Sequence, residues 1–161
     1  MAATREIVAS YRNPTAVVRR LLGQGNREDR NLIYLMVACL IFFVAQTPRL
    51  ARQSFIDGTE LNMLLGATLM AWLFIAPLIL YAMAGLTHLI LKLLRGNPTA
   101  YATRLALFWA LLASSPIVLL HGLTAGFVGP GIELQIVGLF WLCIFLWFWI
   151  GGLLVAYRQA S

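Results

Sequence analysis

Two arginines flank a helix-breaking turn near the middle of the chain, and their side chains are well suited to bind another molecule. Arg95 precedes the turn and Arg104 follows it, and each guanidinium offers a planar fork for carboxylate or phosphate. A compact turn between two helix ends would hold these groups rigidly, so little entropy would be lost on binding. The sequence therefore predicts contact with anionic lipid or an acidic partner segment, unless the charges only orient the chain. The residues concerned are Arg95, Asn97, Pro98 and Arg104.

The turn itself has the residues of a helix stop followed by a helix start. We expect Gly96 to end the first helix in the left-handed conformation, Asn97 to cap the second, and Pro98 to occupy its first turn. The same Asn-Pro-Thr-Ala sequence begins at Asn13. Because Asn and Pro are both common at helix starts, we favour shared helix-start chemistry over internal duplication as the cause of this repeat.

The remaining residues capable of chemistry predict no catalytic, metal or cofactor site. His88 and His121 are expected at opposite membrane faces, so they could not share a metal ion or a haem. Ser114 and Ser115 lack the G-x-S-x-G pattern of a hydrolase nucleophile. Serine hydroxyls beside Pro116 favour hydrogen bonds to helical carbonyls instead.

The composition is typical of an integral membrane protein. The chain has 161 residues, of which 61% are hydrophobic and 11% charged, whereas a soluble domain has about 25% charged residues. Membrane-spanning segments use nearly all of this length, which leaves no separate soluble domain. The net charge of +6 would suggest nucleic acid in a soluble protein. Here it indicates membrane orientation and anionic lipid, and we predict no nucleic-acid partner.

Four apolar segments define an all-α polytopic membrane protein. Pro48 is expected to end the first, and the second contains an uncharged run of 31 residues, read as one tilted helix of about 46 Å with a kink at Pro77. Pro116 is the bending point of the third, and the glycine-rich segment 122–131 is predicted to be a loop. The predicted spans are 31–47, 61–94, 104–121 and 133–157. They form one transmembrane domain of residues 31–157, which is followed by a tail of residues 158–161.

The basic segment of residues 1–30 contains a short amphipathic helix after Asn13. Its pattern is typical of an interfacial helix that lies on the membrane surface and contacts anionic lipid, although a solvated basic tail is the alternative. The predicted apolar side consists of Val17, Val18, Leu21 and Leu22, and the predicted lipid contacts are Arg19 and Arg20.

The fourth segment carries an aromatic face with helical spacing, formed by Trp141, Phe145, Phe148 and Trp149. These residues lie near mid-depth, so they are expected to pack against another helix or acyl chains.

Basic residues determine the predicted orientation. The amino-terminal segment, the central turn and the tail carry six, three and one basic residues, against two in the segment after the first span. The positive-inside rule then places both termini in the cytoplasm. The preference for arginine over lysine suggests a bacterial inner membrane.

A basic helix that begins at Asn13-Pro14 is followed by the segments LILKLLRGN and YATRLALFWALLASSPIVLL. In these features the chain resembles the Yip family of Ypt- and Rab-GTPase-interacting membrane proteins, in particular its small bacterial members. The resemblance implies a membrane fold and a membrane role without a mechanism, and five spans are common in that family whereas four are predicted here.

We expect a non-enzymatic subunit that organises the membrane or binds a partner, either another membrane protein or a second copy, through its basic cytoplasmic face. The alternative is a small transporter or permease component that moves an apolar or lipid-like solute along the aromatic face. A cavity with polar groups would favour the alternative, but the spans offer few such residues: Thr68, Thr87, Ser114, Ser115, Thr124 and Gln135.

Overall fold

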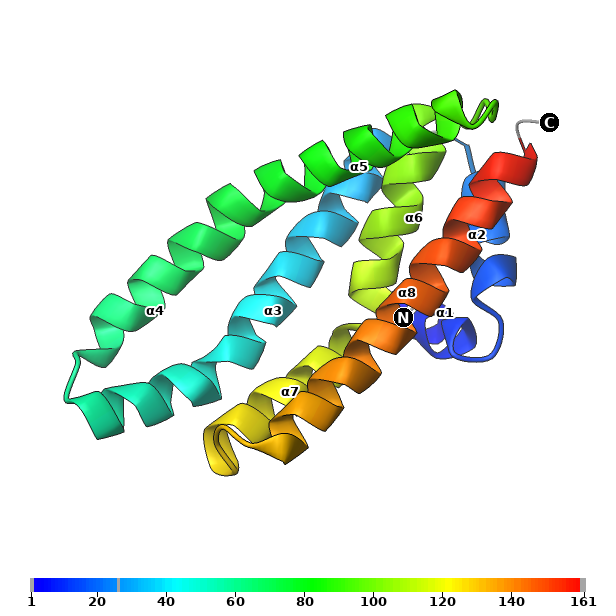
Figure 1. Ribbon diagram of the computed structural model, residues 1–161. Helices are drawn as coiled ribbons and strands as arrows, with labels where there is room; N and C mark the ends of the chain where they lie inside the picture. Colours follow the sequence, from blue (N-terminus) through cyan, green and yellow to red (C-terminus); the bar gives the residue numbers. More distant parts are fainter. Residues whose placement is uncertain (1, 26, 160–161) are drawn as a thin grey trace.

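The computed structural model describes residues 2–25 and 27–159, and every regular element among them is a helix (Figure 1). Three segments, namely α3, the continuous α4–α5 and α8, are long and apolar enough to cross a membrane, and the bent pair α6–α7 is a fourth if counted as one span. The elements are α1 (Ala2–Ser10), α2 (Pro14–Gly23), α3 (Glu28–Asp57), α4 (Leu61–Met70), η1 (Ala71–Ile75), α5 (Ala76–Leu93), α6 (Ala100–Ala113), α7 (Ser115–Phe127) and α8 (Ile132–Gln159).

Pro48 does not end the first long helix, contrary to the sequence prediction. α3 continues through Pro48 to Asp57 and stops at Gly58, whose φ of 70° is left-handed. Proline removes the hydrogen bond to the carbonyl four residues earlier, here that of Val44. The Thr47 hydroxyl donates to this carbonyl at 2.7 Å, so the carbonyl remains satisfied while the helix continues.

The second apolar run forms one continuous helix from Leu61 to Leu93, as predicted. Residues 71–75 form a π-helical turn, η1, just before Pro77. A π turn shifts the hydrogen-bond partners by one residue, which accommodates a proline that has no N–H to donate. Ala84 is the one buried residue of this helix, so α4–α5 lies on the outside of the bundle.

The turn between α5 and α6 is built differently from the prediction. Arg95 rather than Gly96 is left-handed, with a φ of 65°. The amides of Arg95 and Gly96 donate to the carbonyls of Lys92 (3.1 Å) and Leu91 (3.0 Å), which is a Schellman motif. Gly96 is needed for space, because a Cβ there would lie 2.5 Å from Cδ2 of Tyr157 on α8.

The helix after this turn is capped by Thr99 rather than by Asn97. The Thr99 hydroxyl oxygen accepts a hydrogen bond from the amide three residues later at 3.1 Å, so α6 begins one residue after Thr99. Pro98 therefore lies before the cap, where it is buried. In the earlier copy of the same four residues, Asn13 does cap α2 and the proline is its first residue. The surrounding fold therefore decides where each helix starts.

The third apolar segment is broken at Ser114, where α6 and α7 meet at an angle of 44°. Pro116 cannot donate to the carbonyl of Leu112. Two serine hydroxyls satisfy the carbonyls at the break, since Ser115 donates to Leu112 at 2.6 Å and Ser114 donates to Leu111 at 3.0 Å. The serines thus make the carbonyl bonds predicted from the sequence.

The glycine-rich segment 122–131, predicted as a loop, is mostly helical because α7 continues into it. Gly122 and Gly126 face α3, and alanine at either position would collide with backbone. A Cβ on Gly122 would lie 2.7 Å from the carbonyl carbon of Ala45, and one on Gly126 would lie 2.9 Å from that of Pro48. Close helix packing therefore outweighs the low helix propensity of glycine.

α6 is the central helix of the bundle. Twelve of its 14 residues are buried, the largest being Phe108 and Trp109. It contacts α3, α5 and α8, together with both amino-terminal helices. The core is therefore formed around a segment predicted to be one of four equivalent spans.

The apolar side of α2 is covered by protein, which corrects its predicted contact with the membrane surface. Val17, Val18 and Leu21 are buried, and α2 packs against α8 and α6. The preceding turn is anchored as well, because the Tyr11 hydroxyl donates to the carbonyl of Ala113 at 2.7 Å. Burial raises the pKa of Tyr11, which keeps this donor protonated. The amino-terminal helices are thus part of the bundle.

Candidate functional site

The basic residues predicted to bind a partner are divided between internal ion pairs and exposed surface. Arg104 donates to both carboxylate oxygens of Glu28 through Nε (3.2 Å) and Nη2, so its planar fork is already occupied. Arg20 pairs with Glu6 at 2.7 Å. Among the other residues predicted to contact a partner, Arg19, Arg95 and Asn97 have exposed side chains.

A crevice in the bundle is the most distinctive cavity of the structure. It lies between α3, η1–α5, α6 and α8 and has a volume of about 350 Å³. Its outer rim is accessible, because Ile79 and Met83 of α5 are 55% and 37% exposed. Every side chain that lines this apolar crevice is apolar: Ala38, Cys39, Phe42, Trp72, Ala76, Ile79, Leu80, Met83, Leu111, Trp141 and Phe145.

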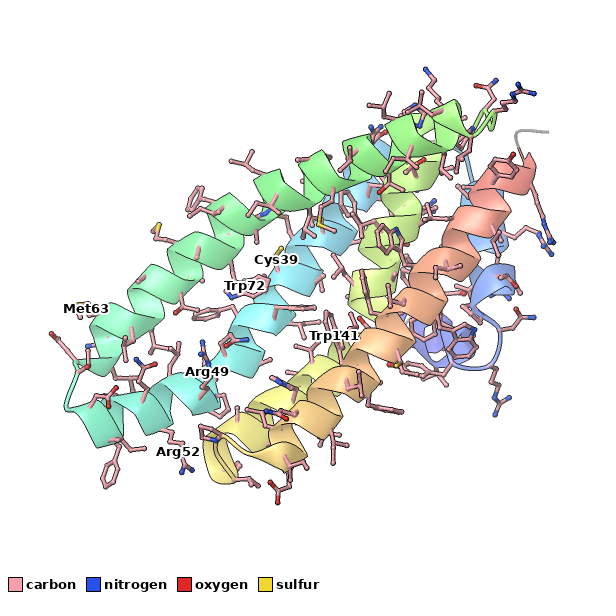
Figure 2. All side chains as sticks on the ribbon, in the orientation of Figure 1. Cys39, Arg49, Arg52, Met63, Trp72 and Trp141 are labelled. Atoms are coloured by element: carbon pink, nitrogen blue, oxygen red, sulfur yellow. The ribbon has the colours of Figure 1, made fainter. Side chains whose placement is uncertain are left out.

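Small residues explain why this volume stays open. Ala38 and Cys39 of α3 and Ala76 of α5 line the crevice from two different helices, so short side chains lie on both of its sides. Trp72 and Trp141, labelled in Figure 2, come from helices on either side of α3 and form the walls. Because Ile79 and Met83 leave its rim exposed, the crevice is a groove in the surface of the bundle and not a void in its interior.

Aromatic rings form the wall on the α8 side. Trp141 stacks on Phe145 with ring centroids 5.4 Å apart, and Phe145 stacks on Trp149 at 5.6 Å. The predicted aromatic face is therefore divided, because Trp141 and Phe145 line the apolar crevice while Phe148 packs edge-on against Tyr11 at 5.1 Å.

Two further hollows continue the apolar crevice toward the α3–α4 end of the bundle. The first, of about 390 Å³, shares Phe42, Trp72 and Trp141 with the crevice and also reaches Gln46 and His121. The second, of about 270 Å³, shares Gln46 and His121 with the first and adds Arg49. We call Gln46, Arg49 and His121 the polar end.

One face of α3 links the apolar crevice to the polar end. Ala38, Phe42, Gln46 and Arg49 follow one another at intervals of three or four residues, which places them on the same helical face. Ala38 and Arg49 are separated by about 16 Å along the helix axis. The cavity system therefore changes from apolar to cationic along its length.

Sequence reasoning missed the polar end because it ended the first helix at Pro48, before Arg49. The helical spacing of Phe42, Gln46 and Arg49 was the available signal. Several polar residues considered for a cavity bond to their own helices instead, as Thr87 does to the Met83 carbonyl at 2.8 Å. His121 lies beside Gly138 of α8, where a Cβ would be 3.4 Å from its Nε2, an ordinary contact distance.

Within the part of the chain that the structure describes, no three His, Cys, Asp or Glu side chains lie together as potential metal ligands. The arrangement combines apolar walls with a cationic end, which is the chemistry that an amphiphilic molecule would require. Comparison with protein-family models, with curated proteins and with solved structures gave no match to this chain.

Proposed function

We propose that this chain is a non-enzymatic integral membrane protein with four spans that binds a lipid-like apolar chain in the apolar crevice, as a carrier or permease component. The observation that carries the proposal is a cavity of about 350 Å³ with apolar lining side chains and an accessible rim, which adjoins at the polar end the polar groups expected of a solute site. Apolar cavities stay dry and take up apolar molecules. A hydrocarbon chain from the surrounding bilayer is the nearest such molecule.

The exposed surface of α4–α5 supports insertion in a bilayer. Leu78, Leu86 and Leu93 are 72%, 60% and 75% exposed, and they belong to a helix of 33 residues. A continuous apolar surface of this kind is unfavourable in water and suits contact with lipid. We propose that this helix faces acyl chains and forms the boundary through which a solute enters the crevice.

The basic residues support an orientation with both termini in the cytoplasm of a bacterial inner membrane. In Figure 1 the start of α3, the α5–α6 turn and the end of α8 lie at one end of the bundle, and the α3–α4 and α7–α8 turns lie at the other. This arrangement agrees with four alternating spans. The polar end then faces the outer side.

Binding of a protein partner through the central turn is less well supported, because the Arg104 fork is engaged by Glu28. Arg19 and Arg95 still provide exposed positive charge for anionic lipid or a partner. Membership of the Yip family likewise stays a prediction.

Photolabelling of the purified chain in nanodiscs tests the proposed crevice. The probe is a long-chain alcohol that carries a diazirine, and the labelled residues are identified by mass spectrometry. We expect labels on α3, η1–α5 and α8 residues that line the crevice, such as Phe42 and Trp141. Ala76→Trp fills the crevice and should strongly reduce this labelling.

Ala82→Trp is the matched control, since it adds the same ring to an exposed position of α5 that does not line the crevice. Labelling should then remain as in the unaltered chain. If labels fall only on the lipid-facing side of α5 and Ala76→Trp changes nothing, the crevice is not a binding site.

A further inference from the structure

Arg49 is an exposed arginine at the polar end, and no acidic side chain in the described part of the chain forms an ion pair with it. The ion pairs found among residues 2–25 and 27–159 are Arg20–Glu6, Arg27–Asp29 and Arg104–Glu28, so none of them involves Arg49. The hollow that Arg49 shares with Gln46 and His121 has no acidic lining residue. The next hollow is lined by Arg49, Arg52 and Asp57, so one carboxylate faces two arginines there.

The neighbouring side chains also supply donors in excess of acceptors. Arg52, one turn along α3, donates to the Gly126 carbonyl at 3.3 Å through Nη1, but its Nε is buried and has no partner in the described part of the chain. Arg49 and Arg52 together line the hollow next to the polar end. A surplus of donors and positive charge favours an anionic ligand.

An aromatic junction joins the apolar crevice to the hollow that leads to the polar end. Phe42 lies between two tryptophans, with ring centroids 5.2 Å from Trp72 and 6.0 Å from Trp141, and these three residues line both the apolar crevice and the hollow that leads to the polar end. These rings therefore offer a shared aromatic surface along which an acyl chain can lie from the crevice toward the polar end.

Given the proposed function, on which this inference rests, we propose that the ligand is a long-chain fatty acid whose carboxylate binds Arg49 at the polar end and whose chain occupies the apolar crevice. The planar arginine fork matches a carboxylate. Gln46 supplies an amide donor beside it, and His121 lies across the hollow on α7. The distance from Arg49 to Ala38, about 16 Å along α3, allows an extended chain between them.

The test compares two photoactivatable probes with the same sixteen-carbon chain, one a carboxylate and the other a primary alcohol, in phosphatidylcholine nanodiscs that hold the full chain. The measured quantity is the concentration of each probe that half-saturates labelling of crevice residues. In the unaltered protein the carboxylate should half-saturate at about one tenth of the alcohol concentration, as expected for one charge-assisted contact.

Arg49→Gln should raise the half-saturating concentration of the carboxylate about tenfold and leave that of the alcohol unchanged. The unchanged alcohol value shows that the variant is folded, and Arg19→Gln removes an equal charge from exposed α2 as the control. Equal values for the two probes in the unaltered protein, or a carboxylate value unaffected by Arg49→Gln, would overturn the head-group assignment while the crevice proposal stands. Absence of crevice labelling by either probe would overturn the proposed function itself.

Discussion

Replacing Gly122 by alanine should destabilise the protein, because α7 approaches the backbone of α3 at this position. The new Cβ would collide with the Ala45 carbonyl oxygen and would lie 2.7 Å from the carbonyl carbon, whereas ordinary contacts begin at 3.4 Å, so the helices must separate by more than about 0.7 Å. Overpacking of this kind costs about 1–3 kcal/mol. The better helix propensity of alanine offsets about 1 kcal/mol of that cost. Backbone cannot rotate away as a side chain can, so the cost lies in the upper half of that range, about 2–3 kcal/mol, and the expected net loss is about 1–2 kcal/mol.

The assay is thermal unfolding in detergent, followed by circular dichroism. A loss of this size corresponds to a decrease in Tm of roughly 2–8 °C for a chain of this length. Gly85→Ala is the matched control, because a Cβ at Gly85 in α5 meets no atom within 4 Å. Its Tm should stay the same or rise by up to about 4 °C. If Gly122→Ala behaves like Gly85→Ala, the close approach of α7 to α3 is not present in the protein.

Three other predictions concern the turn, the amino-terminal helices and the orientation. Thr99→Ala should lower stability by about 1 kcal/mol because it removes the cap of α6, whereas Asn97→Ala should have almost no effect; thermal unfolding measures both, and equal losses would contradict the assigned cap. Trp109→Phe removes the buried hydrogen bond of 3.0 Å to Ser10 and should increase amide hydrogen exchange in α1, an increase that would be absent if α1 were not anchored there. A cysteine at Pro130 in a cysteine-free background should react with an impermeant maleimide from outside intact cells, and reaction only after permeabilisation would reverse the proposed orientation.

The lengths of the apolar helices and the caps made by nearby residues could be predicted correctly from the sequence where no distant residue interferes. The uncharged run after Glu60 forms one helix because its length and hydrophobicity are properties of the segment itself. Asn13 caps α2 for the same reason, since the bond is made within three residues. The carbonyl bonds of Ser114 and Ser115 beside Pro116 are equally local.

The helix boundaries at Pro48 and in the glycine-rich segment could not be predicted in this way. Whether a proline stops a helix depends on whether the freed carbonyl finds another donor, which Thr47 provides. Whether Gly122 and Gly126 break a helix depends on what packs against them, and α3 does so closely enough to require glycine.

The sequence by itself determined the helical, apolar character of this protein and the asymmetric placement of its charge, because these are sums over residue types that do not depend on neighbours in space. Only the tertiary structure decided the candidate site. The apolar crevice is formed by α3, η1–α5, α6 and α8, and the polar end joins Arg49 to His121 from α7. These groups are far apart in the chain and come together only through the packing of these helices, so no single segment encodes the space between them.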